Sequence, residues 1–328
     1  MATKFPFRST LILTVTGGLA VIIPLLLMKI GIIDGYTAHI IKMGGVNAIM
    51  AMSVNMIVGI TGQLSLGQAG FLAIGAFSCI FFNVDVGLPL PLAVLCAVSL
   101  TSLVGFLIGF PVLKLSGDYL AIVTLGFGEI VKVVFNNLKK LTGGPNGRPF
   151  DTIMRIDGEL AFVVTTATLI IVLALLQNFM RSTYGRAILA CRDDEIAANA
   201  SGISIFRYKM IGFVIAAFVA GLGGCLYVMD VGFVKPDVAQ FLRSIDFLIY
   251  VVLGGMGSMT GSILAAYVLT YLQEFLRFLQ DFRLVIYPVI LILVMLFRPQ
   301  GLLGTKEFSF VRFFGKISGI LRRKYGRA

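Results

Sequence analysis

Few side chains in this sequence are suited to chemistry, and the most unusual of them is Glu129. It lies near the middle of the apolar segment 118–138, where a charged group is strongly disfavoured unless it is paired or hydrated. Lys132 follows three residues later, a spacing that puts both side chains on one face of a helix and permits an ion pair. Two roles follow. Either the pair forms a latch that holds two helices together, or Glu129 faces a hydrated pathway and meets the ammonium group of a zwitterionic substrate.

A second group of polar residues lies close to a glycine-rich stretch, residues 59–70. Amide and hydroxyl side chains inside apolar segments usually form hydrogen bonds between helices, each contributing about 0.6 kcal/mol. Lining a transport pathway is the alternative role. The members of this group are Asn47, Asn55, Gln63, Ser65 and Gln68.

The sequence offers no constellation for catalysis, and we expect no catalytic residue, no resident metal and no cofactor bound by this chain. Its single histidine, His39, stands at the start of an apolar segment, where an interfacial position is expected rather than a ligand role. No GxxxxGK[ST] motif occurs, so the chain has no P-loop for ATP. The four cysteines form no CxxC pair, and we expect no disulfide framework.

The elements that carry these residues are membrane spans. Hydrophobic residues make up 58% of the chain and charged residues 13%, whereas soluble domains average about 45–50% apolar and about 25% charged. The apolar runs are continuous rather than alternating, which excludes a β-barrel. We therefore predict an all-α, polytopic transmembrane helical bundle of about ten spans, with eight or nine as alternatives. The predicted spans are 9–32, 36–59, 68–84, 88–112, 118–138, 159–180, 209–230, 244–256, 261–279 and 284–298.

The net charge of +11 indicates membrane topology rather than nucleic-acid binding. Eight of the 27 Lys and Arg residues lie in residues 298–327, beside the single acid Glu307. Positive residues next to spans mark the cytoplasmic side, so we expect both termini to be cytoplasmic. The first span is expected to remain as an anchor. We divide the chain into a transmembrane domain, residues 1–304, and a basic cytoplasmic tail, residues 305–328, which fixes topology, binds anionic lipid or touches a partner.

Four basic residues oppose this topology, because they would fall outside the cell. They are Lys139, Lys140, Arg148 and Arg155.

Two glycine-rich interruptions, residues 59–70 and 253–262, divide the apolar sequence. Unpaired backbone is costly in hydrocarbon, so these segments must be loops at the membrane edge, or broken or re-entrant helices that face protein or water. Broken segments, one in each half of a chain, are typical of a transport pathway at the interface of two related halves. Ordinary tight turns between helices would give the same spacing.

The segment 181–208 is a polar island between two long apolar runs. Asp193 or Asp194 can cap a short helix with an acidic first turn, which suits the helix dipole, and Gly202 is placed to end it. Such a helix is not stable alone, because isolated helices shorter than about 12 residues are marginal in water. It therefore needs a docking surface, supplied by a soluble partner or by the spans of this chain.

The chain resembles the permease subunits of ABC importers for branched-chain amino acids over nearly its whole length. Several sequence blocks of this family occur in order. They are TGQLSLGQAGFLAIGA (61–76), GDYLAIVTLGFGEIVK (117–132), LTGGPNG (141–147), RSTYGRAILACRDDEIAANASGI (181–203), FVAGLGGCLY (218–227), VVLGGMGS (251–258) and FRPQGLLG (297–304). The resemblance implies a multi-pass permease of the bacterial inner membrane that moves leucine, isoleucine and valine, or else urea or short amides.

ABC importer permeases commonly carry a cytoplasmic E-A-A-x-x-x-G loop that docks on the ATPase. Ala197, Ala198 and Gly202 match its alanines and glycine, while Ile196 stands in the place of the glutamate and Glu195 precedes it. The resemblance implies a docking helix formed by Arg192, Asp193, Asp194, Glu195, Ala197, Ala198 and Gly202.

The partners implied are a second homologous permease, two ABC ATPase subunits that bind ATP and Mg, an extracytoplasmic substrate-binding protein and membrane lipid. An autonomous, gradient-driven secondary transporter would also account for the broken helices and Glu129. It would leave the capped island without a partner. A membrane-embedded enzyme is disfavoured, since no nucleophile, metal cluster or acid–base pair is evident.

Overall fold

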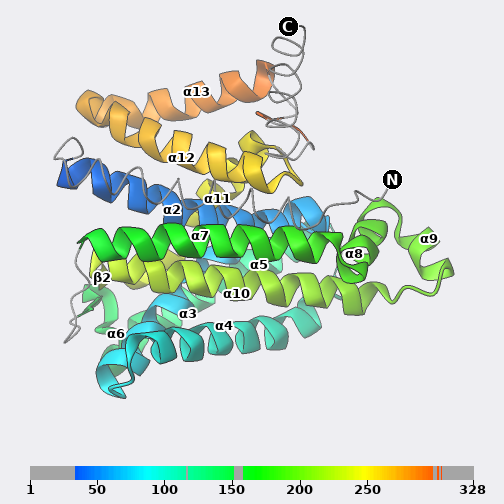
Figure 1. The fold of residues 1–328 in the computed structure, drawn as a ribbon, viewed down its shortest axis with the longest axis horizontal. Helices are drawn as coiled ribbons and strands as arrows, with labels where there is room; N and C mark the ends of the chain where they lie inside the picture. Colours follow the sequence, from blue (N-terminus) through cyan, green and yellow to red (C-terminus); the bar gives the residue numbers. More distant parts are fainter. Residues whose placement is uncertain (1–33, 116, 151–157, 298–300, 303, 305–328) are drawn as a thin grey trace, which may run out of the picture.

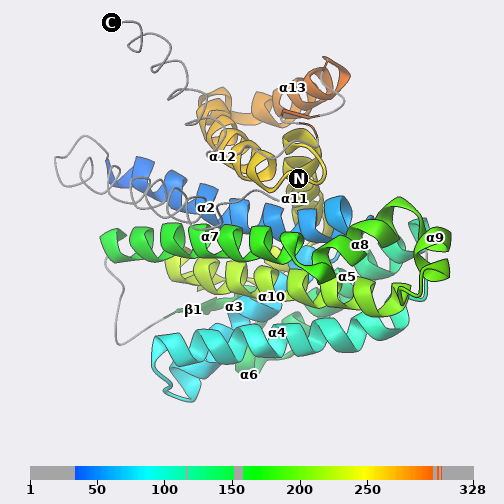
Figure 2. The same cartoon turned by 45° about the vertical axis from the view of Figure 1, so that its right-hand side comes forward.

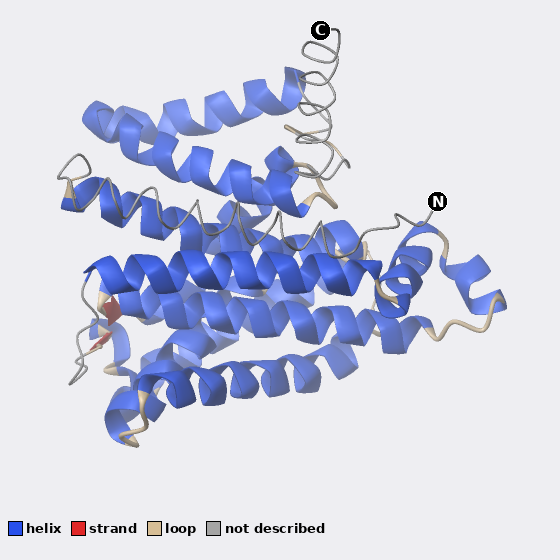
Figure 3. Ribbon diagram, viewed as in Figure 1, coloured by secondary structure: helices blue, strands red, loops and turns tan. Residues whose placement is uncertain are grey.

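The structure, a computed structural model, describes residues 34–115, 117–150, 158–297, 301, 302 and 304. Long helices running nearly side by side form the molecule, and strand structure is confined to one end of it (Figures 1 and 3). The predicted first span, 9–32, and the basic tail, 305–328, lie outside the described residues, as does Arg155.

The elements follow one another as α2 (Gly35–Asn55), η1 (Met56–Ile60), α3 (Gln68–Ile80), η2 (Phe81–Asp85), α4 (Leu90–Val112), α5 (Asp118–Asn137), α6 (Lys139–Thr142), η3 (Gly144–Asn146), β1 (Arg148–Pro149), α7 (Gly158–Arg181), α8 (Thr183–Asp193), α9 (Glu195–Ala200), α10 (Ile205–Val231), β2 (Phe233–Val234), η4 (Pro236–Ala239), α11 (Phe241–Gly254), α12 (Met259–Phe275), η5 (Leu276–Phe282) and α13 (Arg283–Phe297). The turns η1 and η2 are π-helical and continue α2 and α3.

Every predicted span from 36–59 onward coincides with a helix, so the all-α membrane bundle is confirmed. Within the described residues, five helices are long and apolar enough to cross a membrane: α2 with η1, α3 with η2, α4, α7 and α10. The pair α11 and α12 is bent by 120° and makes a sixth span if counted as one. The count of about ten spans is therefore not reached by this measure, and it stays a prediction together with the cytoplasmic placement of the termini.

Helix α2 forms the centre of the bundle. Each of its residues from Gly44 to Asn55 is buried, and α7, α10, α11 and α12 pack around it. Glycines allow α10 to approach α3 closely, because a Cβ on Gly75 would lie 2.3 Å from the carbonyl oxygen of Gly221. Small residues at such contacts are typical of helix packing in membranes.

One end of the bundle carries a two-stranded antiparallel ribbon, in which Arg148 of β1 lies opposite Val234 of β2. The segment LTGGPNG (141–147) turns the chain toward β1, with Gly143, Gly144 and Gly147 all at positive φ. Beside it, Arg148 forms an ion pair with Asp85 and donates hydrogen bonds to its carboxylate. This interaction raises the pKa of the Arg148 guanidinium. We call this the ribbon end; α8 and α9 lie at the opposite end (Figure 1).

Candidate docking helix and coupling site

The polar island folds into two helices, of which the sequence predicted one. Asp194 caps α9 by accepting hydrogen bonds from the backbone N–H groups of Ile196, at 2.9 Å, and Ala197, at 3.0 Å. Gly202 follows α9 with φ of 80°, in the left-handed region that favours glycine. The predicted cap, helix and stop are thus present, and the cap is Asp194 rather than Asp193.

Helix α8 was not predicted. Ser182 caps it, with its side chain accepting from the backbone N–H of Gly185. An S-x-x-G start, without the acidic residue of a capping box, is a weak signal for a helix. Cys191 of α8 is buried, and this burial raises the pKa of its thiol, so it remains protonated.

Helix α9 projects from the bundle instead of lying on its spans (Figures 1 and 2). Within this described helix Ala198 alone is buried, while the Ile196 side chain is 83% exposed. An ion pair between Glu195 and Lys209 holds the start of α9 against the first turns of α10. The island therefore presents an exposed, capped helix with an apolar residue at its first turn.

Arg192 joins this island to the first glycine-rich interruption. Its Nη1 donates a 2.8 Å hydrogen bond to the carbonyl oxygen of Gly59, and its Nη2 lies 2.8 Å from a carboxylate oxygen of Asp193. Gly62 leaves room for the Arg192 stem, since a Cβ there would lie 2.7 Å from Arg192 Cγ. The last residues of α8 are thus fixed to the end of the π-helical turn η1.

The two glycine-rich interruptions meet at the same place. The Asn55 side-chain oxygen accepts a 2.8 Å hydrogen bond from the backbone N–H of Gly257. A Cβ on Gly59 would lie 2.4 Å from the nitrogen of Gly257, so both backbones come together there. The polar island and the two glycine-rich interruptions are thus in mutual contact, although they are far apart in the sequence.

Within the first interruption, residues 61–67 form neither helix nor strand and connect η1 to α3. Its side chains alternate, with Thr61, Gln63 and Ser65 buried and Leu64 exposed. Its backbone is held by side chains of other helices. The N–H of Leu66 donates to Thr124 of α5, and that of Ala69, in the first turn of α3, donates to Ser244 of α11. Buried partners of this kind are what broken helices in membranes require.

The five polar residues of the pathway group are all buried. Asn47 donates to Thr270 of α12, and the Gln68 side-chain oxygen lies 2.9 Å from the Ser53 hydroxyl of α2. The Thr61 hydroxyl lies 3.2 Å from the side-chain oxygen of Gln63, and the Asn55 side-chain oxygen accepts from the N–H of Gly257. The Ser65 hydroxyl and the Gln68 side-chain nitrogen have no hydrogen-bond partner among the described residues. The contacts of Asn47, Asn55 and Gln68 agree with the predicted role in hydrogen bonds between helices. The predicted pathway role stays a prediction.

Glu129 and Lys132 do not pair with each other, contrary to the expected latch. A side-chain oxygen of Glu129 accepts from the backbone N–H of Phe241 at 3.1 Å, at the start of α11. Lys132 forms an ion pair with Asp237 of η4 at 3.6 Å. Both partners lie on the segment that packs against α5: Glu129 binds the backbone at the start of α11, and Lys132 binds a carboxylate of η4. Spacing along α5 alone cannot reveal partners on another segment.

Sequence reasoning also missed a charged cluster at the ribbon end. Asp230 of α10 is almost fully buried and pairs with Lys42 at 2.5 Å and with His39 at 3.2 Å, both on α2. His39 thus has an acidic neighbour on α10, and its predicted interfacial position stays a prediction. Within the described residues no group of three or more His, Cys, Asp and Glu side chains could hold a metal.

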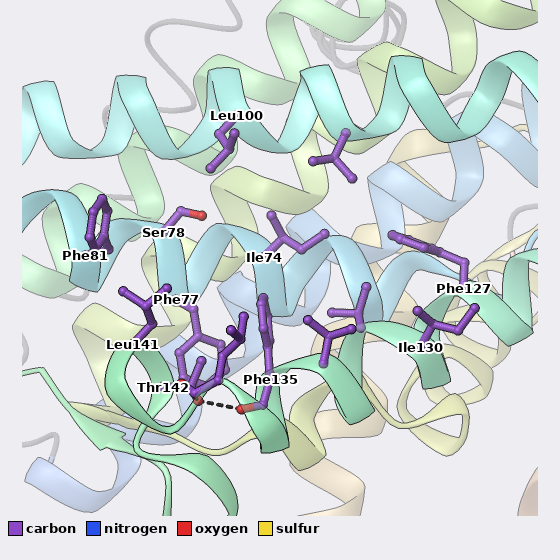
Figure 4. A pocket seen from close by; sticks show the side chains of 14 residues that line it. Ile74, Phe77, Ser78, Phe81, Leu100, Phe127, Ile130, Phe135, Leu141 and Thr142 are labelled. Atoms are coloured by element: carbon purple, nitrogen blue, oxygen red, sulfur yellow. Dashed lines mark hydrogen bonds between the residues drawn. The ribbon is translucent and has the colours of Figure 1, made fainter.

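An apolar cavity of about 420 Å³ lies between α3, α4 and α5. Figure 4 shows Ile74, Phe77, Phe127 and Ile130 among its walls, and a hydrogen bond from Thr142 to the Phe135 carbonyl oxygen at its edge. Ser78 and Thr142 are its polar lining residues. Such walls could not stabilise the two charges of a zwitterion.

A family model described as "Branched-chain amino acid transport system / permease component" matches residues 36–297 of this chain. The chain belongs to this family. The match includes the docking island and both interruptions. No solved structure shows significant similarity to the chain.

Curated relatives agree with the family match. The high-affinity branched-chain amino acid transport system permease protein LivM of Escherichia coli (strain K12) is 39% identical over 300 residues, covering 81% of this chain and 70% of LivM. LivM of Salmonella typhimurium is 40% identical over 288 residues, covering 78% and 67%. The permease protein BraD of Pseudomonas aeruginosa is 26% identical over 292 residues, covering 81% and 94%.

Proposed function

We propose that this chain is a permease subunit of an ABC importer that moves branched-chain amino acids (leucine, isoleucine and valine) across the bacterial inner membrane. The observation that carries the proposal is its similarity to LivM, at 39% and 40% identity over 81% and 78% of the chain. The chain itself does no chemistry in this account. ATP and Mg²⁺ bind to partner subunits.

Helix α9 is the docking element for one ATPase. An exposed six-residue helix is marginal in water, and Ile196, 83% exposed, offers an apolar side chain to a cleft. The end of the bundle that carries α8 and α9 is then cytoplasmic, and the ribbon end faces outward. The start of α9 is fixed by the four residues Arg192, Asp193, Asp194 and Glu195. The small residues Ala197, Ala198 and Gly202 leave the helix narrow enough to enter a cleft on the ATPase.

Movement of α9 reaches the membrane through Arg192. When ATP binding draws two ATPases together, each docked helix moves as a rigid body. The hydrogen bond from Arg192 to Gly59 transmits this movement to η1, and the contact of Gly59 with Gly257 passes it to the bend between α11 and α12. Breaks in helices absorb such changes, because loop residues change φ and ψ readily.

The complete importer contains a second, homologous permease, two ABC ATPase subunits and an extracytoplasmic substrate-binding protein. The similarity of this chain to two differently named permease proteins supports the second permease. LivH of Escherichia coli (strain K12) is 31% identical over 147 residues, covering 44% of this chain and 47% of LivH. Two related permeases of one transport system suit a paired assembly.

The pathway is assigned to the side of α5 that carries Glu129, with the buried polar group of Asn47, Asn55, Gln63, Ser65 and Gln68 holding the broken helices behind it. The carboxylate of Glu129, on α5, lies against the start of α11, where the helix dipole compensates its charge. A carboxylate there can attract the ammonium group of an amino acid without a strongly bound substrate site.

Purification from the native membrane in mild detergent tests this proposal. We expect stoichiometric recovery of a P-loop ATPase and a second permease, and ATP hydrolysis that is stimulated by leucine with its binding protein. Urea with its own binding protein serves as the competing substrate. Recovery of this chain alone, with transport driven by an ion gradient, would overturn the proposal in favour of a secondary transporter.

A further inference from the structure

The apolar cavity between α3, α4 and α5 is not used in the proposed transport cycle. The buried side chains of Ile74 and Phe77 form its floor on α3, and α4 and α5 form its two walls. Both walls pack against α3 but make little contact with each other. The cavity is therefore a groove between two helices, which we call the α5 groove (Figure 4).

The α5 groove is open along its side. Three residues of its α5 wall, Ile130, Val134 and Leu138, are 64%, 45% and 42% exposed. Because residues four apart lie on one face of a helix, they form a continuous apolar stripe, which we call the α5 stripe. Glu129 and Lys132 lie on another face of α5, since one helical turn takes 3.6 residues. The groove is thus separate from the surface assigned to the pathway.

The surface beside the opening is suited to lipid. Leu103 and Leu107 protrude from α4, and Leu100 of the same helix lines the groove. No charged residue occurs between Leu90 and Val112. Lipid acyl chains contact such a surface, whereas water against apolar walls is unfavourable. The groove therefore opens toward hydrocarbon.

The length of the groove matches one leaflet of a bilayer. Between Phe127 and Leu138, which both line it, α5 advances by about 16 Å at 1.5 Å per residue. The hydrocarbon core of a bilayer is about 30 Å thick, so one leaflet occupies about 15 Å. Leu138 and Leu141 lie toward the ribbon end, which faces outward in the proposed orientation (Figures 1 and 4). An acyl chain of the outer leaflet would fit along the groove.

Two lysines stand at the outer end of the groove. Lys139 and Lys140 lie between Leu138 and Leu141, which are both lining residues. Both lysines are exposed, and neither forms an ion pair with any described residue. They belong to the basic residues that oppose the expected topology, because positive charge is normally concentrated on the cytoplasmic side. The phosphate of a lipid headgroup at the membrane surface would supply their missing counter-charge.

We infer that the α5 groove binds one acyl chain of an anionic phospholipid from the outer leaflet, with Lys139 and Lys140 holding its phosphate. The inference rests on the proposed function for the direction in which the chain crosses the membrane. A bound acyl chain fills the space between α4 and α5. It thereby supports α5, which carries Glu129 on another face.

Photolabelling with a lipid tests this inference. The complex recovered with this chain is placed in nanodiscs of phosphatidylcholine that contain a small fraction of phosphatidylglycerol carrying a diazirine on one acyl chain. Diazirine phosphatidylcholine with the same acyl chains is the reference lipid. We expect phosphatidylglycerol to label the α5 stripe about fivefold more than the reference, since lysines at the membrane surface favour anionic lipid.

Two double variants with the same loss of charge separate the site from a general effect of charge. Lys139→Gln with Lys140→Gln should reduce labelling by phosphatidylglycerol to the level of the reference lipid. Lys114→Gln with Lys235→Gln removes two exposed lysines that do not line the groove, and should leave the labelling unchanged. Equal labelling by both lipids, or labelling of Leu107 as strong as that of the α5 stripe, would mean bulk lipid only and overturn the inference. A stripe that neither lipid labels would mean that a protein partner covers it, which also overturns the inference.

Filling the groove gives an independent test. Val134→Trp places an indole in the groove, while Leu107→Trp adds the same side chain to the outer surface of α4. The first variant should lose labelling at Leu138 and the second should keep it. A Val134→Trp variant that melts like the wild type and still labels Leu138 would contradict the inference. Leucine uptake by the same preparations keeps the two proposals apart: selective labelling without uptake overturns the proposed function alone, and uptake without selective labelling overturns the lipid site alone.

Discussion

The guanidinium of Arg192 donates a 2.8 Å hydrogen bond to the carbonyl oxygen of Gly59. This contact joins the end of α8, which precedes α9, to the π-helical turn η1, which continues the central helix α2. Gly59 in turn touches the backbone of Gly257 at the bend between α11 and α12. In the proposed mechanism, a movement of α9 reaches both glycine-rich interruptions through this one side chain.

Replacing Arg192 with Ala should uncouple the ATPase from transport. The variant loses the bond to Gly59 but keeps α9, its cap and its exposed side chains, so the ATPase still binds. We expect leucine uptake in proteoliposomes to fall about tenfold, because the conformational step sets the rate, while ATPase recovery is unchanged. Arg186→Ala is the control, since Arg186 contacts neighbours within its own segment. Normal uptake by the Arg192→Ala variant would contradict the coupling route.

A Cβ at Gly59 should disrupt the junction of the two interruptions. In the Gly59→Ala variant this atom would lie 1.9 Å from the Asn55 side-chain oxygen and 2.4 Å from the Gly257 nitrogen. We expect a clearly lower melting temperature in detergent and loss of uptake. Gly35→Ala serves as the control because a Cβ there meets no atom within 4 Å. Equal melting temperatures for both variants would show that the contact is not close in the protein.

Ile196→Asp should weaken ATPase binding without changing the stability of this chain. The side chain is 83% exposed, so its folded environment is water and the substitution costs little within the monomer. In a complex, the same position is buried and a carboxylate would be desolvated. Co-purified ATPase should decrease strongly for Ile196→Asp and remain for Ile196→Leu. Retention of the ATPase by both variants would mean that α9 docks through another face.

Removing the cap of α9 should weaken the same contact by a smaller amount. Asp194 accepts two backbone hydrogen bonds, and replacing such a cap with Ala typically costs about 1 kcal/mol. The Asp194→Ala variant should therefore lose ATPase binding in part, and Asp194→Ser should restore it. Quantifying bound ATPase for the three proteins decides this. An Asp194→Ser variant as weak as Asp194→Ala would assign the effect to the lost charge rather than to the cap.

Two substitutions separate the structural role of Glu129 from its proposed role in transport. Glu129→Gln retains an oxygen that can accept from Phe241 but removes the charge, so the melting temperature should stay close to that of the wild type while leucine uptake falls. Glu129→Ala should lower both. If Glu129→Gln transports leucine with wild-type affinity and rate, Glu129 has no pathway role and acts as a cap for α11.

Local signals in the sequence were sufficient for much of the fold. Continuous apolar runs identified the helices from 36–59 onward. A cap at Asp193 or Asp194 followed by Gly202 predicted α9, because caps and stops depend on residues close in sequence. The five polar residues near the first interruption were predicted either to form hydrogen bonds between helices or to line a pathway, and the structure buries all five. Glycine clusters marked both interruptions.

Contacts between distant segments were beyond such signals. The partner of Glu129 is the backbone of Phe241, and that of Lys132 is Asp237; both depend on how η4 crosses α5. The hydrogen bond from Arg192 to Gly59 likewise depends on the position of α8, a helix for which the sequence carried no strong capping signal. The spacing along one helix permitted an ion pair between Glu129 and Lys132, but in the fold each residue binds a partner on another segment.

Uptake of labelled leucine by proteoliposomes tests the central claim most directly. The complex purified with this chain is reconstituted with ATP enclosed on the ATPase side and with leucine-loaded binding protein on the other side. We predict leucine accumulation that requires ATP, is abolished by a non-hydrolysable ATP analogue and is insensitive to ionophores. Accumulation that persists without ATP and collapses when ionophores remove the ion gradients would contradict the account.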